Sequence, residues 1–136
     1  MIIEKPDQPQ KRPRSNPEMR LQAECVQMAW NDFPQTRRLL FHIANELDRP
    51  DANAMIGARR RAEGIIRGVS DLILMIPRGK YHALCIEMKT ESGVQSRYQK
   101  DWQGLVEAQG YRYEVCRSKE QFKEILEGYL SLPIPR

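Results

Sequence analysis

Residues 68–89 read Gly-Val-Ser-Asp-Leu-Ile-Leu-Met-Ile-Pro-Arg-Gly-Lys-Tyr-His-Ala-Leu-Cys-Ile-Glu-Met-Lys, and this stretch decides the fold. The continuous apolar run at 72–76 predicts a strand that is buried on both faces. Residues 77–80 predict a turn, because proline presets φ and glycine permits a positive φ. Residues 81–88 are again mostly apolar and predict a second strand. The stretch therefore predicts a β-hairpin.

Three charged residues lie at the outer ends of these apolar strands: Asp71 on the first, and Glu87 and Lys89 on the second. A buried charge is costly unless it is paired or binds a metal. If Ile76 pairs with His82, Asp71 lies opposite Glu87. A register shifted by one residue would put the two carboxylates on opposite faces of the hairpin. A shared site therefore requires a loop with an odd number of residues, or a bulge.

Two facing carboxylates repel each other and favour a divalent cation or a proton between them. Oxygen ligands of this kind suit Mg²⁺ or Mn²⁺, with water completing the coordination shell. Lys89, next to them, can hold or polarise a water or a phosphate oxygen. Carboxylates, a metal and a lysine together indicate a site for phosphodiester hydrolysis. A structural salt-bridge cluster in an unrelated α/β domain stays open as an alternative.

The residues around this site resemble, in their order, the virus-type replication-repair nuclease (VRR-NUC) domain of the PD-(D/E)XK nucleases. The resemblance covers roughly residues 17–118. The matching features are Glu24, Phe-His-Ile-Ala-Asn-Glu at 41–46, Gly-Val-Ser-Asp at 68–71, Ile-Glu-Met-Lys at 86–89, Gly93, Ser96, Gln99, Trp102 and Gly-Tyr at 110–111. Ser70 stands where the family usually has proline, and Ala44 where proline often precedes the asparagine. Neither departure removes a ligand.

The resemblance implies an α/β fold in which helices flank a small mixed sheet, the PD-(D/E)XK restriction-endonuclease-like core. It also implies a metal site. Its expected ligands for Mg²⁺ or Mn²⁺ are Asp71, Glu87, Glu24 of the first helix and the Met88 carbonyl. The three carboxylates contribute a charge of −3 and Lys89 contributes +1, so the remaining charge of −2 matches one divalent ion. Composition alone favours a surface position for Glu24.

Two further residues receive roles in the predicted catalysis. Lys89 is expected to orient the attacking water or to stabilise the developing negative charge. Gln99 is expected at the rim of the site, where its amide would orient a water or a phosphate. An exposed, inert glutamine is the alternative for Gln99.

The rest of the chain predicts elements in the order α-β-(α)-β-β-α-β-α. A capping box of Ser15 and Glu18 precedes a helix that ends near Asp32. A strand is expected over 39–43 and a partly helical segment over 53–63. A second capping box, Ser92 with Gln95, is expected to begin a helix that ends at Gln109. The later expectations are a core face of Tyr98, Trp102 and Leu105 on that helix, a strand over 111–116 and a last helix after Ser118.

Length and composition indicate one domain, over residues 17–136, after a disordered or extended basic arm over 1–16. The chain has 136 residues, of which 40% are hydrophobic, and no apolar run approaches the length of a membrane span. No signal-peptide region is evident, which favours a cytoplasmic location, including the host cytoplasm for a phage-encoded protein. Cys25, Cys85 and Cys116 form no metal-binding pair and are expected to be reduced core residues.

The net charge of +4 favours an anionic partner, most simply nucleic acid. DNA is the expected partner, and no membrane and no nucleotide cofactor are expected. The basic arm can follow DNA phosphates or only solubilise the chain. His42 can contact a phosphate or be a hydrogen-bonded structural histidine. The candidate nucleic-acid contacts are Arg59, Arg60, Arg61, Arg67, His42 and Asn45.

These observations predict a metal-dependent DNA endonuclease. The resemblance further implies a homodimer that is selective for branched DNA such as Holliday junctions. A non-catalytic nucleic-acid-binding module with a vestigial nuclease site is the alternative.

Overall fold

A computed structural model describes residues 16–44 and 54–136 of the chain. The predicted N-terminal arm, apart from Asn16, and Asn45 lie outside these residues. The elements in order are α1 (Pro17–Asp32), the short 3₁₀ helix η1 (Pro34–Thr36), β1 (Leu40–His42), α2 (Ala54–Ala62), β2 (Leu72–Leu74), β3 (Leu84–Met88), α3 (Arg97–Ala108), β4 (Arg112–Cys116) and α4 (Lys119–Leu130). None of the helices in the described part of the chain is long and apolar enough to cross a membrane.

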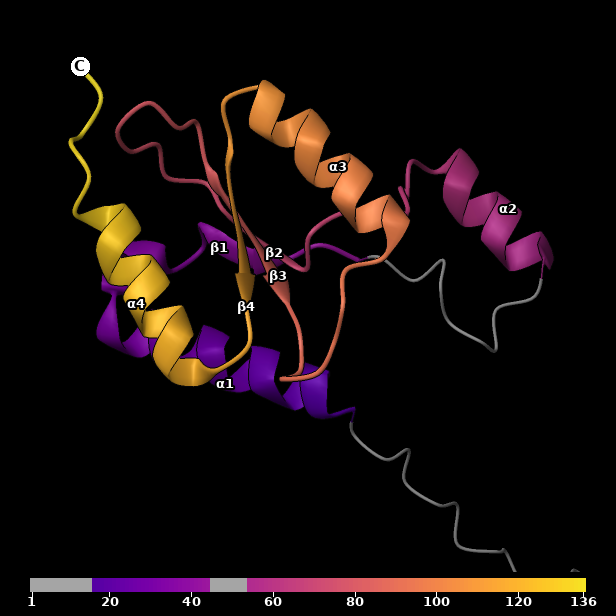
Figure 1. Ribbon diagram of the computed structural model, residues 1–136, viewed down its shortest axis with the longest axis horizontal. Coiled ribbons are helices and arrows are strands. Elements are labelled where there is room, and N and C mark those ends of the chain that lie inside the picture. Colours follow the sequence, from indigo (N-terminus) through magenta and orange to yellow (C-terminus); the bar gives the residue numbers. More distant parts are fainter. Residues whose placement is uncertain (1–15, 45–53) are drawn as a thin grey trace, which may run out of the picture.

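The four strands form one sheet in the order β1-β2-β3-β4 (Figure 1). Strands β1, β2 and β3 pair antiparallel, whereas β3 and β4 pair parallel through the crossover helix α3. The predicted small mixed sheet with flanking helices is therefore confirmed. Because β4 runs in the same direction as β3, the C-terminal ends of these two strands lie at one end of the sheet.

The observed hairpin register agrees with the predicted register at the open end of the hairpin, next to Asp71 and Glu87. Leu72 pairs with Ile86, so the next position outward sets Asp71 opposite Glu87. At the turn, an isolated bridge joins Arg78 to Tyr81, which is out of register by one residue with the ladder of β2 and β3. The hairpin thus contains the irregularity that a shared carboxylate face requires.

The hydrophobic core lies on one face of the sheet. Helices α1 and α4 pack against each other on that face, and α3 lies on the opposite side (Figure 1). Alternate residues of β2 and β3 point into the core, as the period of a strand requires. The core consists of Cys25, Ala29, Leu40, Leu72, Leu74, Ile76, Leu84, Ile86, Met88, Cys116, Phe122, Leu126 and Tyr129. Cys25, Cys85 and Cys116 are buried and free, as expected.

The prediction that 72–76 is buried on both faces is wrong. Strand β2 ends at Leu74, Ile73 is half-buried and Met75 is 50% exposed. Helix α3 contacts β4, at the edge of the sheet, so it leaves this side of β2 less covered. The face of the sheet that carries the odd-numbered residues is therefore partly open at β2, whereas Cys85 and Glu87 on β3 are buried.

The predicted inner face of α3 is also wrong. Tyr98 is 52% exposed and Leu105 is 67% exposed. The half-buried side of the helix is instead formed by Gln99, Trp102, Gln103 and Val106. The Trp102 ring makes an edge contact with Tyr113 of β4, with ring centroids 6.1 Å apart. An inner face that is half polar is consistent with a helix that covers a polar site as well as part of the sheet.

Two predicted helix starts are corrected as well. Asn16, not Ser15, caps α1, because the Asn16 side chain accepts a hydrogen bond from the Glu18 N–H. Ser96, not Ser92, caps α3, and it forms a reciprocal capping box with Gln99. At α3 the sequence contains two pairs with capping-box spacing, and the pair nearer the observed helix is the one used. At α1 the Asn16 side chain caps the helix without a capping box.

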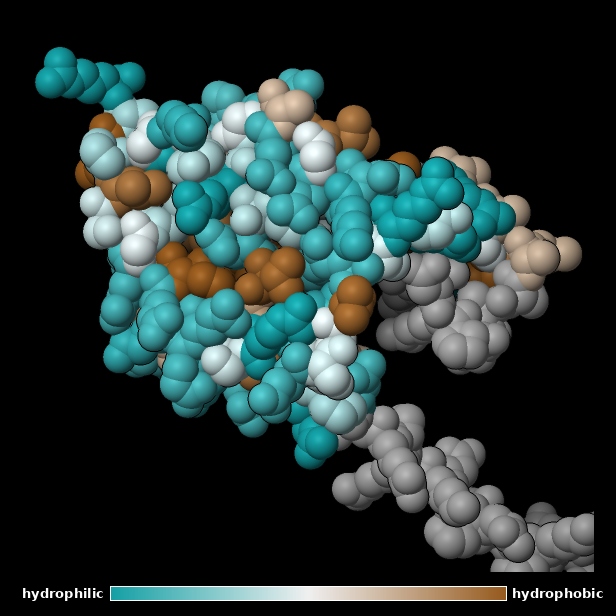
Figure 2. Space-filling view, viewed as in Figure 1, coloured by the Kyte–Doolittle hydropathy of each residue, from teal (hydrophilic) through white to brown (hydrophobic). Residues whose placement is uncertain are grey.

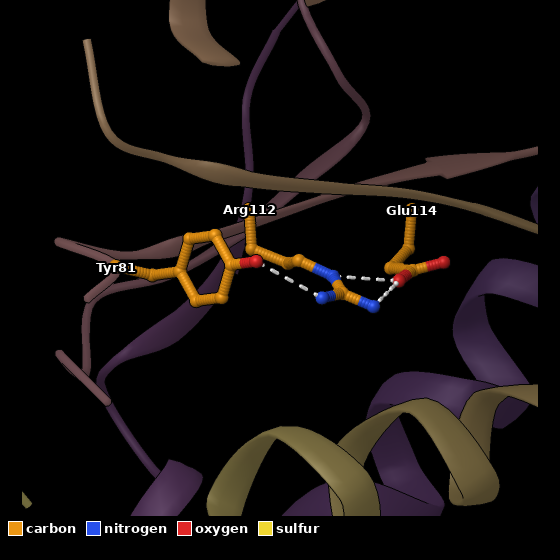
Figure 3. A network of polar contacts seen from close by, with 3 residues as sticks. All are labelled: Tyr81, Arg112 and Glu114. Carbon is orange, nitrogen blue, oxygen red and sulfur yellow. Dashed lines mark hydrogen bonds and ion pairs between the residues drawn. The ribbon is translucent and has the colours of Figure 1, made fainter. Parts of the chain in front are cut away.

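The end of the sheet that holds the turn is braced by polar contacts (Figure 3). The Arg112 guanidinium donates hydrogen bonds to Glu114, at 2.7–2.8 Å, and to the Tyr81 hydroxyl, at 3.2 Å. Beside this network, hydrophobic residues gather on the surface between α3 and α4, over the edge strand β4 (Figure 2). A hollow there is lined in part by Leu84 and Ile125. It lies at the opposite end of the sheet from Asp71 and Glu87.

Candidate active site

Asp71 is held at the start of β2 by backbone contacts on both sides. Its Oδ2 accepts a hydrogen bond of 2.7 Å from the Met88 N–H, and its carbonyl accepts one of 2.9 Å from the Ile43 N–H. Burial raises the pKa of this carboxyl, against the lowering effects of the Met88 N–H and of charge on His42 and Lys89. The carboxylate is thus fixed next to β3 in a partly desolvated position.

Glu87 is buried, with 1% of its surface exposed, on the strand opposite Asp71. Neither carboxylate oxygen has a hydrogen-bond partner among the described residues. Burial raises the pKa of Glu87, whereas the charge of Lys89 and the polar groups of Gln95 and Tyr113 lower it. Gln95 and Tyr113 thus lie close enough to act on Glu87, although neither makes a hydrogen bond of good geometry to its carboxylate oxygens. A buried carboxylate without such a bond is costly, so this position favours a bound cation or a proton.

Gln95, Gln103 and Tyr113 form a polar cover near Glu87. The Gln95 amide nitrogen donates to the Gln103 side-chain oxygen, at 3.0 Å, and lies 3.4 Å from the Tyr113 hydroxyl. Burial, and then the charge of Glu87, raise the pKa of Tyr113 above its ordinary value. Tyr113 therefore stays a neutral hydroxyl at physiological pH. The sequence does not predict Gln95 and Tyr113 as site residues, because nothing in their spacing relates them to Glu87.

The glutamate of helix α1 that faces the site is Glu18. Burial, and then the charge of Asp71, raise the pKa of Glu18, whereas Lys89 lowers it. Glu24, the expected ligand, is exposed and lines another hollow together with Lys119. Six residues along an α-helix turn the side chain by about 120° and move it by about 9 Å. The structure thus brings Glu18 near Asp71 and Lys89, and does not bring Glu24 there.

His42 lies at the end of β1, close to the backbone of Asp71. Its Nδ1 is 2.8 Å from the Asp71 carbonyl oxygen and 3.1 Å from the Gln22 amide nitrogen. Nδ1 donates to the carbonyl when it carries the proton, and accepts from the amide in the other tautomer. The ring is exposed. His42 therefore both supports the Asp71 loop and reaches the surface beside it.

Gln99 is only half-buried and takes part in the cap of α3. Its side-chain oxygen accepts a 2.8 Å hydrogen bond from the Ser96 N–H, and its own N–H donates to the Ser96 hydroxyl. The oxygen is therefore committed to the capping box, which leaves the amide NH₂ for any contact with a water or phosphate.

Arg117 holds the loop that joins β3 to α3. Its Nη1 donates to three backbone carbonyls of that loop, those of Thr90, Glu91 and Gly93, at 2.8, 3.3 and 2.6 Å. The same loop carries Gln95 toward Glu87. No sequence motif marks Arg117, because backbone carbonyls carry no residue identity.

The four arginines expected to contact nucleic acid do not form one cluster. Arg59 is exposed and pairs with Glu63 at 3.4 Å. Arg60 is half-buried and Arg61 exposed on the same helix α2. Arg67 lies over the ring of Tyr98 with 5.0 Å to the centroid. Arg61 and Arg67 line a hollow together.

The donor set fits a hard divalent cation. Magnesium is commonly held by one or two carboxylates with water in the remaining positions. Asp71 and Glu87 supply such a pair, and the oxygens of Glu87 have no other partner in the described residues. Residues 16–44 and 54–136 contain no group of three His, Cys, Asp or Glu side chains placed to hold a metal. The site accordingly fits a two-carboxylate arrangement rather than the expected three.

Comparison with known proteins identifies the family and the fold. The family model of the VRR-NUC domain matches residues 4–120. A solved structure of a VRR_NUC domain protein superposes with a TM-score of 0.71 and 21% sequence identity, covering 86% of this chain and 90% of that chain. At that identity the likeness shows a shared fold. A comparison with curated proteins finds no match.

Proposed function

The chain belongs to the VRR-NUC domain family, a family of the nuclease type, and from that premise we propose that it is a metal-dependent DNA endonuclease. The observation that carries this proposal is the buried carboxylate of Glu87, which has no hydrogen-bond partner among the described residues and lies opposite Asp71. Two desolvated carboxylates on adjacent strands are neutralised either by protons or by a cation, and a divalent cation is the ligand we propose.

Asp71 and Glu87 would hold Mg²⁺ or Mn²⁺, with Glu18 near enough to act on the same ion or its waters through charge. Such an ion, when bound, lowers the pKa of a water and neutralises charge on the scissile phosphate. The Met88 carbonyl remains a proposed backbone ligand.

Lys89 follows Glu87 on the same face of β3 and influences the charge of all three carboxylates. We assign to it the orientation of the attacking water or the stabilisation of the developing negative charge. Tyr113 and the Gln95 amide can donate hydrogen bonds to water or phosphate oxygens, because both carry N–H or O–H groups near Glu87.

A cleavage assay tests the proposal. Labelled four-way junction, flap, linear duplex and single-stranded DNA are incubated with the protein in Mg²⁺, Mn²⁺ or EDTA. Cleavage that needs the metal and is lost in Lys89→Ala supports the proposal. Junction binding that is indifferent to EDTA, without any cleavage, would favour the non-catalytic binding module. Unchanged turnover in Lys89→Ala would remove the role given to that residue.

The preferred substrate and the assembly are part of the same proposal. We propose branched DNA as the substrate and a homodimer as the active form, because a dimer would place two sites on two strands. The hydrophobic surface over the edge strand β4 (Figure 2) is the face we assign to the second copy. Sedimentation of the protein at micromolar concentration tests this, and a monomer mass would contradict it.

A further inference from the structure

A hollow of about 330 Å³ lies beside the N-terminal end of α3, apart from the carboxylate pair. Figure 1 shows the segment that leaves α2 passing this end of α3. We call this feature the Tyr98 hollow; its lining residues are Arg61, Ile65, Ile66, Arg67 and Tyr98. The lining thus combines an aromatic ring, aliphatic side chains and two guanidinium groups.

Tyr98 is 52% exposed, whereas Trp102, the other aromatic residue of α3, is half-buried and contacts Tyr113. The Arg67 guanidinium lies over its ring with 5.0 Å to the centroid, a cation–π contact. Ile66 is also exposed, by 56%. An exposed ring with a guanidinium on it offers a flat surface on which another flat, electron-rich group can stack.

Gly68 fixes the distance between the Tyr98 hollow and the carboxylate pair. Its φ is +87°, and a Cβ built on it would lie 2.4 Å from the Tyr98 carbonyl oxygen, so the two backbones touch. Asp71 follows three residues later. The Cα atoms of Gly68 and Asp71 are therefore at most about 11 Å apart, even in a fully extended chain. The backbone of Tyr98 thus borders the segment that leads into Asp71, so one bound DNA strand can reach both the hollow and the carboxylate pair.

We infer that the Tyr98 hollow binds the base of an unpaired nucleotide in the DNA strand that enters the site, an inference that rests on the proposed nuclease function. A base offers a π face to Tyr98 or to the guanidinium plane of Arg67, and aliphatic contact to Ile66. Its phosphate meets the positive charge of Arg61 and Arg67. A paired base cannot enter, because its neighbours in the helix cover both faces. The hollow thus gives this chain a preference for DNA with an unpaired arm.

Fluorescence anisotropy in EDTA measures this preference without cleavage. The probes are a labelled duplex and the same duplex with a single-stranded flap. In Tyr98→Ala the dissociation constant for the flap DNA should rise roughly 5- to 100-fold, the effect of losing one stacked base, while that for the duplex stays unchanged. Tyr98→Phe keeps the ring and should bind both probes as the wild type does.

Leu105→Ala is the matched control, because Leu105 is equally apolar and exposed on the same helix but lies outside the hollow. It should bind both probes normally. An unchanged flap affinity in Tyr98→Ala, or an equal loss for both probes, would overturn the inference while leaving the nuclease proposal intact. Failure of the wild-type protein to bind or cut any DNA would remove the proposed function and this inference together.

Discussion

The Met88 N–H donates a 2.7 Å hydrogen bond to the carboxylate of Asp71. This bond joins the start of β2 to the end of β3 and sets the Asp71 carboxylate beside the backbone that carries Glu87 and Lys89. One oxygen of Asp71 is thereby fixed, so the position of the carboxylate does not depend on a bound ion. The arrangement of the site is built into the hairpin.

We predict that Asp71→Asn abolishes cleavage and leaves the fold intact. The asparagine oxygen can still accept the Met88 hydrogen bond, so the backbone geometry is kept while the negative charge is lost. We expect the rate to fall by at least about 10²–10³-fold, the size of losing one charge-stabilising group in an active site. Cleavage kinetics measure this, and an unchanged melting temperature in EDTA shows that folding is preserved.

Glu18→Gln and Glu24→Gln test which glutamate of α1 serves the site. Glu18 interacts through charge with Asp71 and Lys89, so its neutralisation should weaken metal-dependent cleavage by about 10- to 100-fold, the size typical of groups that support a metal site. Glu24 is exposed on another side of the same helix, and its variant is the matched control, with wild-type activity expected. Titration of the cleavage rate with Mn²⁺ measures both. Normal activity in Glu18→Gln together with loss in Glu24→Gln would reverse our assignment.

The central hairpin and its register could be predicted from the sequence, because strand alternation and the position of charges constrain each other. Only one register sets Asp71 opposite Glu87, and that register is observed. The mixed sheet could also be predicted, because a helix between β3 and β4 permits parallel pairing. These features follow from local pattern and chain connectivity.

The parts of the site that depend on tertiary packing could not be predicted. Glu18 and Glu24 are both helical glutamates, and only the rotation of α1 against the sheet decides which one faces Asp71. The rotation of α3 likewise decides the exposure of Tyr98. Its aromatic ring predicts burial, but α3 turns Gln99 and Trp102 inward and leaves Tyr98 exposed. Arg117 binds backbone carbonyls, which any sequence supplies. In each case the deciding quantity is the orientation of one element against another.

Without metal, the buried carboxylates should make the stability of this protein depend on pH. The pKa values of Glu87, Asp71 and Glu18 are raised by burial, so the folded chain binds these protons more tightly than the unfolded chain. Protonation of these three carboxyl groups adds to the free energy of unfolding. This contribution is complete at a pH below the ordinary carboxylate pKa and is lost as the pH rises through the raised pKa values. In EDTA, the melting temperature of the wild type should therefore fall as the pH rises above this range.

Glu87→Gln isolates this effect, because it removes the most buried of these charges. At neutral pH in EDTA the variant should melt about 2–8 °C higher than the wild type, and the difference should shrink as the pH falls. Mg²⁺ should raise the melting temperature of the wild type and leave that of the variant unchanged. A difference that is independent of pH would show that the charge of Glu87 is compensated without a metal.

We predict that Arg117 acts on catalysis by positioning the loop that carries Gln95. Arg117→Met keeps the aliphatic stem but loses the three hydrogen bonds to the loop carbonyls, so the maximal cleavage rate should fall by roughly tenfold while DNA affinity is unchanged. Arg97→Met, which removes another exposed arginine, is the control and should keep the maximal rate. A weaker affinity with a normal maximal rate would instead make Arg117 a phosphate contact.

Gly68→Ala should destabilise the fold far more than Gly64→Ala, although both glycines have a positive φ. The φ of Gly64 is +98°, but a Cβ there would meet nothing within 4 Å, so only the backbone strain of about 1–2 kcal/mol applies. At Gly68 a Cβ would lie 2.4 Å from the Tyr98 carbonyl oxygen and 2.9 Å from the Gln99 nitrogen, and backbone atoms cannot rotate away. Urea unfolding in EDTA measures both free energies. If the two variants lose equal free energy of unfolding, the start of α3 can move away from Gly68. The spacing between the Tyr98 hollow and Asp71 would then be adjustable.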